Sequence, residues 1–283
     1  MQERFCVITG ASSGIGYETA LGLARAGAAL LIIGRDAART ADAAARLRAL
    51  GGDRAIDWLC ADLAEQSGVR ALVQQISVRY PRIDVLINNA GATFAGRALT
   101  RDGFERTFAL NHLAYHTLTL GLLPLLRAAP AARIVNVASA MHAYATLDFD
   151  DPQSLRDYQG TRAYSRSKLA NVMFTYALAR RLAGTGMTVN CLHPGVVASG
   201  FGLNSRGPLR VLMRAVRPFL IGPARGARTS LHLAQSAAVA DRSGGYYVRC
   251  RLRPSSAQSR DIGAQERLWQ LSEQLTQMPF QAY

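Results

Sequence analysis

The feature that most constrains the fold is a glycine-rich turn between a short apolar run and an amphipathic one. The turn, Thr9-Gly10-Ala11-Ser12-Ser13-Gly14-Ile15-Gly16, follows the apolar run Phe5–Thr9 and opens the helical stretch Gly14–Gly27. Glycines let the backbone turn tightly and approach a ligand, and a helix start offers free N–H groups and a positive dipole end. This context indicates a strand–turn–helix unit that holds a pyrophosphate.

Short apolar runs and longer amphipathic stretches alternate along the rest of the chain. The runs are rich in Val and Ile and read as strands: Ala28–Gly34, Ala55–Cys60, Val85–Asn88, Arg133–Ser139, Met187–His193 and a late edge strand near Tyr246–Arg249. The stretches read as helices: Ala37–Leu50, Gln66–Tyr80, Phe104–Ala128 and Arg162–Gly184. Such alternation predicts an α/β fold, a Rossmann-type doubly wound parallel sheet. We expect one domain over residues 1–283, with an insert at 200–222.

Composition and cysteine spacing indicate a globular protein in a reducing compartment. Of the 283 residues 49% are hydrophobic and 18% charged, which suits a sizeable core. The four cysteines are far apart, without the spacing of a zinc site or a disulfide framework. With the first strand beginning at Phe5 and no run of 18 apolar residues, we expect neither a signal peptide nor a spanning helix. We therefore expect a cytoplasmic protein.

Positive charge gathers in the last third of the chain. The formal net charge is +14, and residues 200–260 hold eleven arginines and the single acid Asp241. Such a region could face nucleic acid, an anionic membrane or an acidic partner. Because no nucleic-acid motif accompanies the charge, we favour a solvated basic surface and expect no nucleic-acid partner.

Lys168 is the only lysine among 33 Lys and Arg residues. A sequence that uses arginine elsewhere indicates a role here that a planar guanidinium does not fill. Tyr164 lies four residues earlier, so a helix places both side chains on one face. An ammonium beside a phenol lowers the tyrosine pKa and makes it a usable acid and base near neutral pH. The alternative is a surface lysine without a function.

The end of the second predicted strand bears on the cofactor. An acid directly after this strand accepts hydrogen bonds from the ribose hydroxyls of NAD, whereas an arginine pairs with the 2′-phosphate of NADP. Arg35 holds the first position, and Asp36 follows it. Arg35 favours NADP, and Asp36 keeps NAD open as the cofactor.

The glycine turn also fits a different enzyme class. Gly10, Ser12 and Gly14 spell the GxSxG pattern of a hydrolase nucleophile elbow. A hydrolase needs an Asp and a His later in the chain, and this reading leaves Tyr164 and Lys168 without a role. We therefore favour the nucleotide-binding interpretation.

Together these motifs resemble the short-chain dehydrogenase/reductase family. They occur in the family's order: the glycine turn, Asn88-Asn89-Ala90-Gly91, Asn111, Ser139, Tyr164-x-x-x-Lys168 and Pro194-Gly195. The stretches 165–171, 192–197, 257–261 and 266–269 are similar to the retinol dehydrogenase and WW-domain oxidoreductase branch. The likeness spans about the whole chain. The chain departs from the branch pattern at Ala138 and Ser199, and we expect no N-terminal anchor, which bears on the membrane setting and the substrate.

The resemblance implies a role for each residue of the motifs. Ser139 would hold the substrate oxygen, Tyr164 would exchange its proton, Lys168 would bind the nicotinamide ribose, and Asn111 would keep a water for proton relay. The implied cofactor-binding residues are Gly10, Ser12, Ser13, Gly14, Ile15, Gly16, Arg35, Asp62, Leu63, Asn89, Ala90, Gly91, Tyr164, Lys168, Pro194, Gly195 and Val197. Two hydroxyls aimed at an oxygen suit a carbonyl that becomes an alkoxide. The hydride comes from the cofactor, so no metal is needed.

Structural alternatives exist for these residues. Ser139 could cap a helix, Asn111 could satisfy buried backbone, and Tyr158 could compete with Tyr164, although Arg162 rather than a lysine stands four residues after it. We expect His112, His116 and His193 to be hydrogen-bonded structural residues rather than catalytic ones.

Two further predictions concern surfaces. In the insert Gly207–Ile221, the apolar stripe of Leu209, Leu212, Met213, Val216 and Leu220 adjoins Arg206, Arg210, Arg214 and Arg217. The insert is read as a substrate lid, as core packing or as a helix on anionic membrane. By resemblance, the helices Phe104–Ala128 and Arg162–Gly184 would join two copies, with Leu118, Leu122, Met173 and Ala177 facing outward.

The sequence thus predicts an NADP-dependent oxidoreductase that interconverts an alcohol and a carbonyl on a small or medium lipophilic substrate. Two alternatives stay open: a non-redox isomerase or cyclase of a biosynthetic pathway, and a cofactor-sensing binding protein. A homo-oligomer and a peripheral contact with membrane are further expectations about partners.

Overall fold

The computed structural model describes residues 1, 3–52, 55–195 and 221–281, and within them the chain forms one eight-stranded sheet. The strand order is β3-β2-β1-β4-β5-β6-β7-β8, and every neighbouring pair is parallel except β7 with β8. The strands are β1 (Phe5–Thr9), β2 (Ala29–Gly34), β3 (Ile56–Cys60), β4 (Val85–Asn88), β5 (Arg133–Val137), β6 (Thr188–His193), β7 (Gly245–Val248) and β8 (Arg251–Arg253). The order reverses between β1 and β4, which confirms the predicted doubly wound sheet.

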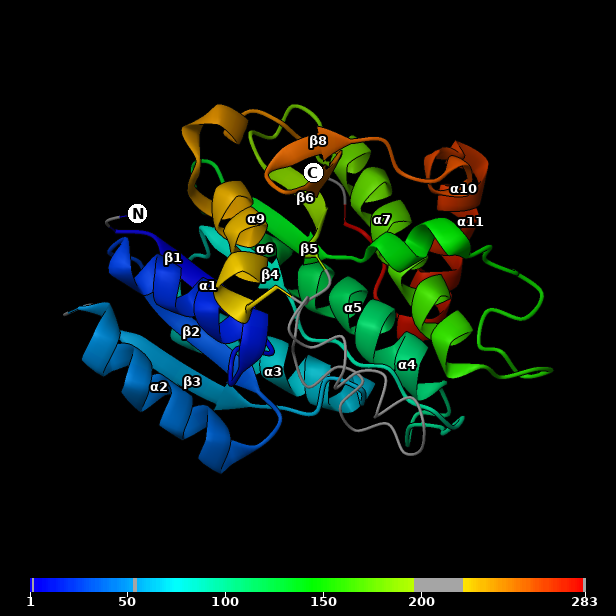
Figure 1. The fold of residues 1–283 in the computed structure, drawn as a ribbon, viewed down its shortest axis with the longest axis horizontal. Helices are drawn as coiled ribbons and strands as arrows, with labels where there is room; N and C mark the ends of the chain where they lie inside the picture. Colours follow the sequence, from blue (N-terminus) through cyan, green and yellow to red (C-terminus); the bar gives the residue numbers. More distant parts are fainter. Residues whose placement is uncertain (2, 53–54, 196–220, 282–283) are drawn as a thin grey trace.

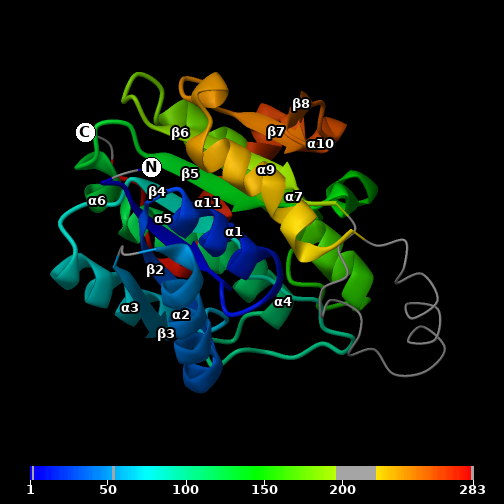
Figure 2. The ribbon, with the colours of Figure 1, turned by 60° about the vertical axis from the view of Figure 1, so that its left-hand side comes forward.

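Helices cover both faces of the sheet, and this explains the uninterrupted apolar runs of the strands. One face carries α1 (Gly14–Arg25), α2 (Ala37–Gly51) and α9 (Pro223–Gln235), and the other carries α3 (Gln66–Arg79), α5 (Ala114–Gly121) and α7 (Gly160–Arg181) (Figures 1 and 2). Cys6, Val7 and Ile8 of β1 are fully buried, with alternate side chains in the two core clusters. Strands buried on both faces have no face in water, so their sequences show continuous apolar runs rather than alternating apolar and polar residues.

The long helix predicted over Phe104–Ala128 is divided in the structure. It begins as the short α4 (Arg106–Phe108), continues as the π-helical turn η1 (Ala109–Leu113) and α5, and ends as α6 (Leu123–Arg127). Pro124 lies in the first turn of α6, where its missing N–H does no harm. The apolar period continued through these breaks, so the pattern alone did not reveal them.

The C-terminal segment contains elements that the sequence analysis did not predict. The late strand is present as β7, but the chain then turns at Arg249 and Cys250, both with positive φ, into the antiparallel β8. Two consecutive left-handed residues are the geometry of a tight hairpin turn. The helices α9, α10 (Ala257–Arg260) and α11 (Ile262–Thr276) were missed as well.

The outward face predicted for self-association is wrong. Leu118, Leu122, Met173 and Ala177 are all at most 1% exposed, so they belong to the chain's own core. On the same layer, α11 packs against α7 and α5, and its Trp269 stacks on Phe174 with ring centroids 5.7 Å apart. The sequence analysis did not predict α11. This helix covers a surface of α5 and α7 that would otherwise face outward.

The predictions about a spanning helix and about the insert at 200–222 can be compared with the described residues only. Within those residues, no helix is long and apolar enough to cross a bilayer. The predicted insert at 200–222 lies outside the described part of the chain, apart from Ile221 and Gly222.

Candidate active site

A cavity of about 750 Å³ opens at the carboxyl ends of the parallel strands. In open α/β sheets this edge, at the point where strand order reverses, is where ligands bind. The cavity collects most residues singled out in the sequence, namely Gly10, Ser12, Ser13, Gly14, Ile15, Gly16, Arg35, Asp62, Leu63, Asn89, Ala90, Gly91, Ser139, Tyr164, Lys168, Pro194 and Gly195. Asn111 lies behind its wall, and Val197 lies outside the described residues.

The glycine turn forms a cradle whose backbone packs too closely on its neighbours to admit side chains. Gly10 has a φ of +67°, and a Cβ there would lie 2.8 Å from the Cα of Ala90. A Cβ on Gly16 would lie 2.3 Å from the backbone oxygen of Gly10. Both contacts are shorter than real Cβ atoms tolerate, so glycine is required at both positions. The turn therefore stays tight beside the start of α1, whose residues Gly14, Ile15 and Gly16 line the cavity where a pyrophosphate would lie.

Asn89 fastens the glycine turn to the end of β4. Its Nδ2 donates to the backbone oxygens of Thr9 at 2.8 Å and Gly10 at 3.2 Å. In return, the backbone amides of Asn89 and Ala90 donate to the Thr9 hydroxyl at 2.9 and 3.0 Å. Asn89 thus has a structural role in the cradle, and its side-chain amide is already engaged there.

Two arginines lie at the far end of the cavity, after β2. Arg35 lines the wall as predicted, and Arg39, in the first turn of α2, lines it too. Asp36 caps α2, with its Oδ1 accepting from the Arg39 amide at 2.9 Å. A carboxylate used as a helix cap has less capacity for ribose hydroxyls. Arg39 was missed by the sequence analysis, although it follows Arg35 at helical spacing.

Ser139, Tyr164 and Lys168 meet at the other end of the cavity. Ser139 follows β5 and caps the short 3₁₀ helix η2 (Ala140–Tyr144), its Oγ accepting from the Met141 amide at 3.2 Å. The Tyr164 hydroxyl on α7 hydrogen-bonds the Ser139 side chain, which lowers its pKa by less than burial raises it. Ser139 therefore caps a helix, as the structural alternative proposed. It also lines the cavity beside Tyr164.

The predicted lowering of the Tyr164 pKa is wrong for the chain by itself. Burial raises the pKa of Tyr164 to about 12. Lys168 Nζ lies 5.8 Å from the Tyr164 ring centroid, and it donates to the backbone oxygen of Val137 at 2.8 Å. Burial also lowers the pKa of Lys168 to about 7, so its charge near neutral pH is incomplete. Tyr164 therefore holds its proton.

Asn111 lies on the π-helical turn and is fully buried. Its amide brackets Ala92: Nδ2 donates to the Ala92 oxygen and Oδ1 accepts from the Ala92 amide, each at 2.9 Å. Nδ2 also donates to Ser167 Oγ at 2.9 Å. Asn111 thus joins the loop after β4 to α7, in line with the backbone-satisfying alternative. π-Helical turns are frequent at functional sites, because they re-aim side chains.

The competing residues have structural partners. The Tyr158 hydroxyl donates to the Phe94 oxygen at 3.0 Å and lies 3.1 Å from the Thr107 hydroxyl, so it is engaged outside the Tyr164 site. His112 and His116 are buried against Ser272 and Thr276 of α11, as structural histidines should be. His193 lines the cavity, and its Nδ1 has no hydrogen-bond partner among the described residues, so its structural role stays a prediction.

Comparison with known proteins decides the family. Residues 4–207 match the family model described as short chain dehydrogenase. The chain belongs to the short-chain dehydrogenase family. Membership makes it an NAD(P)-dependent oxidoreductase, and the hydrolase reading of the glycine turn is set aside. Mouse retinol dehydrogenase 14 is 41% identical over 286 residues, covering 96% of this chain and 86% of the relative. Mouse retinol dehydrogenase 12 is 39% identical and covers 95% and 85%.

Solved structures of this short-chain dehydrogenase fold agree with the architecture. A protein from Mycobacterium Paratuberculosis superposes with a TM-score of 0.81 at 33% identity, covering 99% of this chain and 96% of that one. The Pseudomonas aeruginosa RhlG/NADP active-site complex superposes with a TM-score of 0.70 at 30% identity, covering 87% and 94%. The predicted resemblance to the retinol dehydrogenase branch is confirmed by the two retinol dehydrogenases above.

Proposed function

We propose that this short-chain dehydrogenase uses NADP to interconvert an alcohol and a carbonyl on a small or medium lipophilic molecule. The observation that carries the proposal is the hydrogen-bonded pair of Ser139 and Tyr164, with Lys168 buried beside it, at one end of a cavity that begins at the glycine cradle. The residues implied by the family resemblance keep their proposed roles, with Asn111 added as the residue that fixes the Ala92 loop.

The cavity residues fit NADP. The cradle of Gly10, Gly14 and Gly16 would take the pyrophosphate, and Arg35 with Arg39 would take the 2′-phosphate by charge-assisted hydrogen bonds. Lys168 would bind the nicotinamide ribose. The related RhlG was solved with NADP, which supports the same choice. When bound, the nicotinamide supplies the hydride.

The chain's own residues handle the proton. Ser139 and Tyr164 offer two hydroxyl donors to one substrate oxygen, which stabilises the negative charge that develops there during reduction. Because its pKa is raised to about 12, Tyr164 carries a proton to donate across the physiological pH range. Oxidation of an alcohol needs the phenolate instead, so we expect the oxidation rate to rise with pH while the reduction rate stays nearly flat.

Apolar side chains near the Tyr164 end of the cavity support a lipophilic substrate. Phe94, Leu110 and Met141 line the wall, and two relatives bear the name retinol dehydrogenase. The four cysteines are free, which supports a reducing, cytoplasmic compartment. A lid from residues 200–222, a homo-oligomer and a peripheral membrane contact remain proposals.

Oxidation of NADPH against a panel of medium-chain and aromatic aldehydes and ketones tests the function. We expect carbonyl-dependent loss of NADPH absorbance, with kcat falling about 10³-fold in Tyr164→Phe while fluorescence titration shows unchanged NADPH affinity. Turnover of a substrate without net NADPH use would favour the isomerase alternative. If Tyr164→Phe loses NADPH binding together with activity, Tyr164 is structural.

A further inference from the structure

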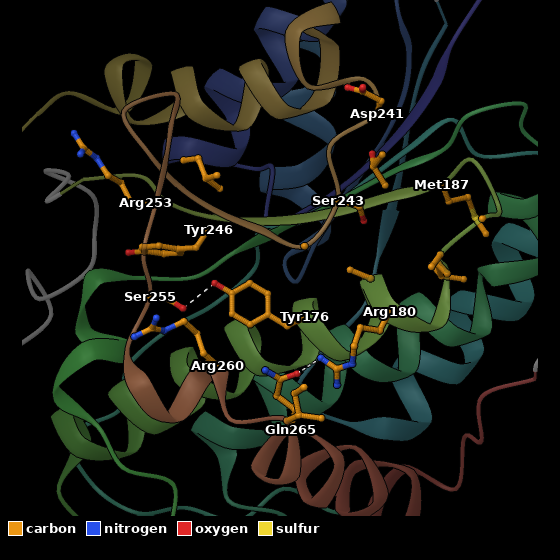
Figure 3. Close-up of a pocket in the computed structure, with 18 of the residues that line it drawn as sticks. Tyr176, Arg180, Met187, Asp241, Ser243, Tyr246, Arg253, Ser255, Arg260 and Gln265 are labelled. Carbon is orange, nitrogen blue, oxygen red and sulfur yellow. Dashed lines mark hydrogen bonds between the residues drawn. The ribbon is translucent and has the colours of Figure 1, made fainter.

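A second, larger cavity lies at the opposite end of the sheet from the glycine cradle. This rear pocket, of about 1090 Å³, is bounded by the C-terminal half of α7, the starts of β6 and β7, strand β8, and the α10–α11 segment (Figure 3). Tyr164 and Tyr176 stand twelve residues apart on α7, which is about 18 Å of helix. The rear pocket therefore shares no residue with the proposed active site.

One side of the rear pocket is basic. Tyr246 and Arg253 are cross-strand partners on β7 and β8, so their side chains share a face of the sheet. Arg260 lies on the same side of the pocket, below them in Figure 3. Neither arginine has an ion-pair partner among the described residues, whereas Arg180, also in the wall, is paired with Glu266. Two exposed guanidiniums thus remain available to a ligand.

Tyr246 adds a hydrogen-bond donor to this basic side. The residue is 4% exposed, and its hydroxyl oxygen is not among the buried polar atoms that lack a partner, so it reaches the solvent in the pocket. In Figure 3 its hydroxyl end is directed toward the side that holds Arg253 and Arg260. Its neighbour Tyr176 is satisfied, donating to Ser255 Oγ at 2.7 Å. A hydroxyl that reaches the solvent in the pocket can donate to a ligand acceptor in place of water.

The remaining wall is largely apolar. Ala179, Leu182 and Met187 line it, with Met187 on the side away from Arg253 and Arg260 (Figure 3). At the mouth, Leu252 and Ile262 are 56% and 59% exposed, although both are large hydrophobic residues. Apolar walls with a few placed polar groups are typical of small-molecule sites.

We propose that the rear pocket binds a small amphipathic anion. A carboxylate or phosphate head would accept from Arg253, Arg260 and the Tyr246 hydroxyl, and a hydrocarbon chain would lie along Ala179, Leu182 and Met187. The charge decides the ligand class, since Asp241 is the single acid of the wall and lies across the pocket from Arg260. A free fatty carboxylate and an anionic lipid headgroup share this chemistry.

Titration calorimetry of the NADPH-saturated protein with decanoate tests the proposal. We expect saturable binding that weakens at least tenfold in the double variant Arg253→Glu/Arg260→Glu and severalfold in Tyr246→Phe. Arg251→Glu is the matched control, because Arg251 is an exposed arginine of the same strand outside the pocket wall. The control should bind decanoate as the wild type does. Decanol, which has the same chain without charge, should bind at least tenfold more weakly.

Binding to lipid vesicles distinguishes an anionic lipid headgroup from a free fatty carboxylate as the ligand. Co-sedimentation with phosphatidylserine vesicles but not phosphatidylcholine vesicles, lost in the double variant, supports the proposal with a lipid headgroup as ligand. Decanoate could also enter the cavity of the proposed active site, which we call the front cavity. The arginine variants therefore decide where decanoate binds. The proposal is overturned if decanoate and vesicles both fail to bind, or if the double variant binds them as the wild type does.

A separate observation concerns His142, which joins Ser139 to the C-terminal segment. Its Nδ1 lies 2.7 Å from the Ser139 backbone oxygen, and the Ser256 amide donates to its Nε2 at 3.2 Å. Because an amide N–H only donates, Nε2 is the acceptor, and Nδ1 must carry the hydrogen and donate to Ser139. The ring is 2% exposed and packs edge-on against Tyr246 at 4.7 Å.

We infer that His142 is a positioning residue for Ser139, an inference that rests on the proposed function. The hydrogen bond holds the backbone of Ser139 where its Oγ meets Tyr164. A small misplacement of such a group lowers kcat much more than it lowers cofactor affinity. Because the Ser256 amide fixes the tautomer, His142 Nδ1 is always the donor and the Ser139 oxygen the acceptor.

Carbonyl reduction by three variants tests the role of His142. His142→Leu removes the donor, and we expect kcat to fall 10- to 100-fold with the KM for NADPH unchanged. His142→Asn keeps a donor near the Nδ1 position and should recover most of kcat. Ser256→Pro removes the amide that fixes the tautomer, together with a hydroxyl that has no partner among the described residues, at a φ of −61° that proline adopts, and should lower kcat severalfold.

The outcomes distinguish this inference from the proposed function. An inactive wild type contradicts the function itself. A wild type that is active, with His142→Leu as fast as wild type, or with the Asn and Leu variants equally slow at equal melting temperature, overturns the role of His142. If His142→Leu does not fold, the Ser256→Pro variant decides in its place.

Discussion

The front cavity and the rear pocket differ in how their walls are held. Around the front cavity, the side chains of the proposed site are fixed by hydrogen bonds to the backbone: Asn89 to Thr9, Asn111 to Ala92, Lys168 to Val137. The rear pocket is walled by long side chains such as Arg253 and Met187. Fixed walls make geometry costly to change, whereas flexible walls adapt. Substitutions at the front should therefore change chemistry sharply, and those at the rear should change free energies gradually.

The largest effect is expected from Lys168→Arg. The variant keeps a positive charge, but the guanidinium is broader than the ammonium that now donates to Val137 in a fully buried site. We expect kcat for carbonyl reduction to fall at least about 100-fold, or nearly 3 kcal/mol in the barrier. Steady-state kinetics measures the loss, and circular dichroism checks the fold. A folded variant with near-normal kcat would show that charge alone suffices.

The next effect concerns cofactor choice at the Arg35 end. Arg35→Asp should repel a 2′-phosphate and accept from free ribose hydroxyls, lowering the NADP/NAD ratio of kcat/KM by about 10- to 100-fold. Arg39→Asp should shift the ratio in the same direction by less. Arg48→Asp is the charge control on the helix that carries Arg39, because Arg48 lies outside the cavity wall and donates to the Ile56 oxygen instead. An unchanged ratio in Arg35→Asp would make Arg35 an ordinary loop charge.

A stability effect follows from the buried ammonium. The Lys168 pKa is lowered from 10.5 to about 7 in the folded chain, so the unfolded chain binds more protons between these values. Stability contributed by this residue therefore rises as pH increases from about 7 toward 10.5. Lys168→Met should be more stable than the wild type at pH 7, by about 1–3 kcal/mol after the lost bond to Val137 is counted. The difference should shrink toward pH 10.

Urea unfolding of both proteins at several pH values measures this effect, because other titrating groups cancel in the difference. A gain that stays constant with pH would mean that packing, rather than the charge, explains it. Loss of activity together with gain of stability would be the signature of a functional residue kept at a cost to the fold.

The smallest effect is expected at the rear, at Glu266. Arg181 and Arg180 hold the pKa of Glu266 at about 2, below its ordinary 4.5. This carboxylate contributes stability above about pH 4.5 that is lost as pH falls through about 2. Glu266 is 36% exposed, so Glu266→Gln should cost only about 0.5–1 kcal/mol at pH 7. The two urea midpoints should converge at low pH, and a difference that persists there would point to packing.

The sequence alone determined the parallel strands and most of the residues that line the front cavity. The glycine turn, Asn89, Ser139 and the Tyr164–Lys168 spacing each lie at or near the end of a predicted strand or on one helix face. Parallel strands bring such ends to one edge, so local motifs suffice to assemble the site. Arg39 lies in the first turn of the helix that follows β2, so the same argument could have placed it at this edge of the sheet.

Tertiary structure decided what depends on partners distant in the sequence. The pKa of Tyr164 is raised because burial outweighs its hydrogen bond with Ser139, while the ammonium of Lys168 turns to Val137. His142 gains its fixed tautomer from Ser256, 114 residues later. Leu118 and Met173 were expected outside, and they are buried in a helical layer that α11 completes. A pattern records which face of an element is apolar, but only the packed chain shows what covers that face and how far a charge is removed from water.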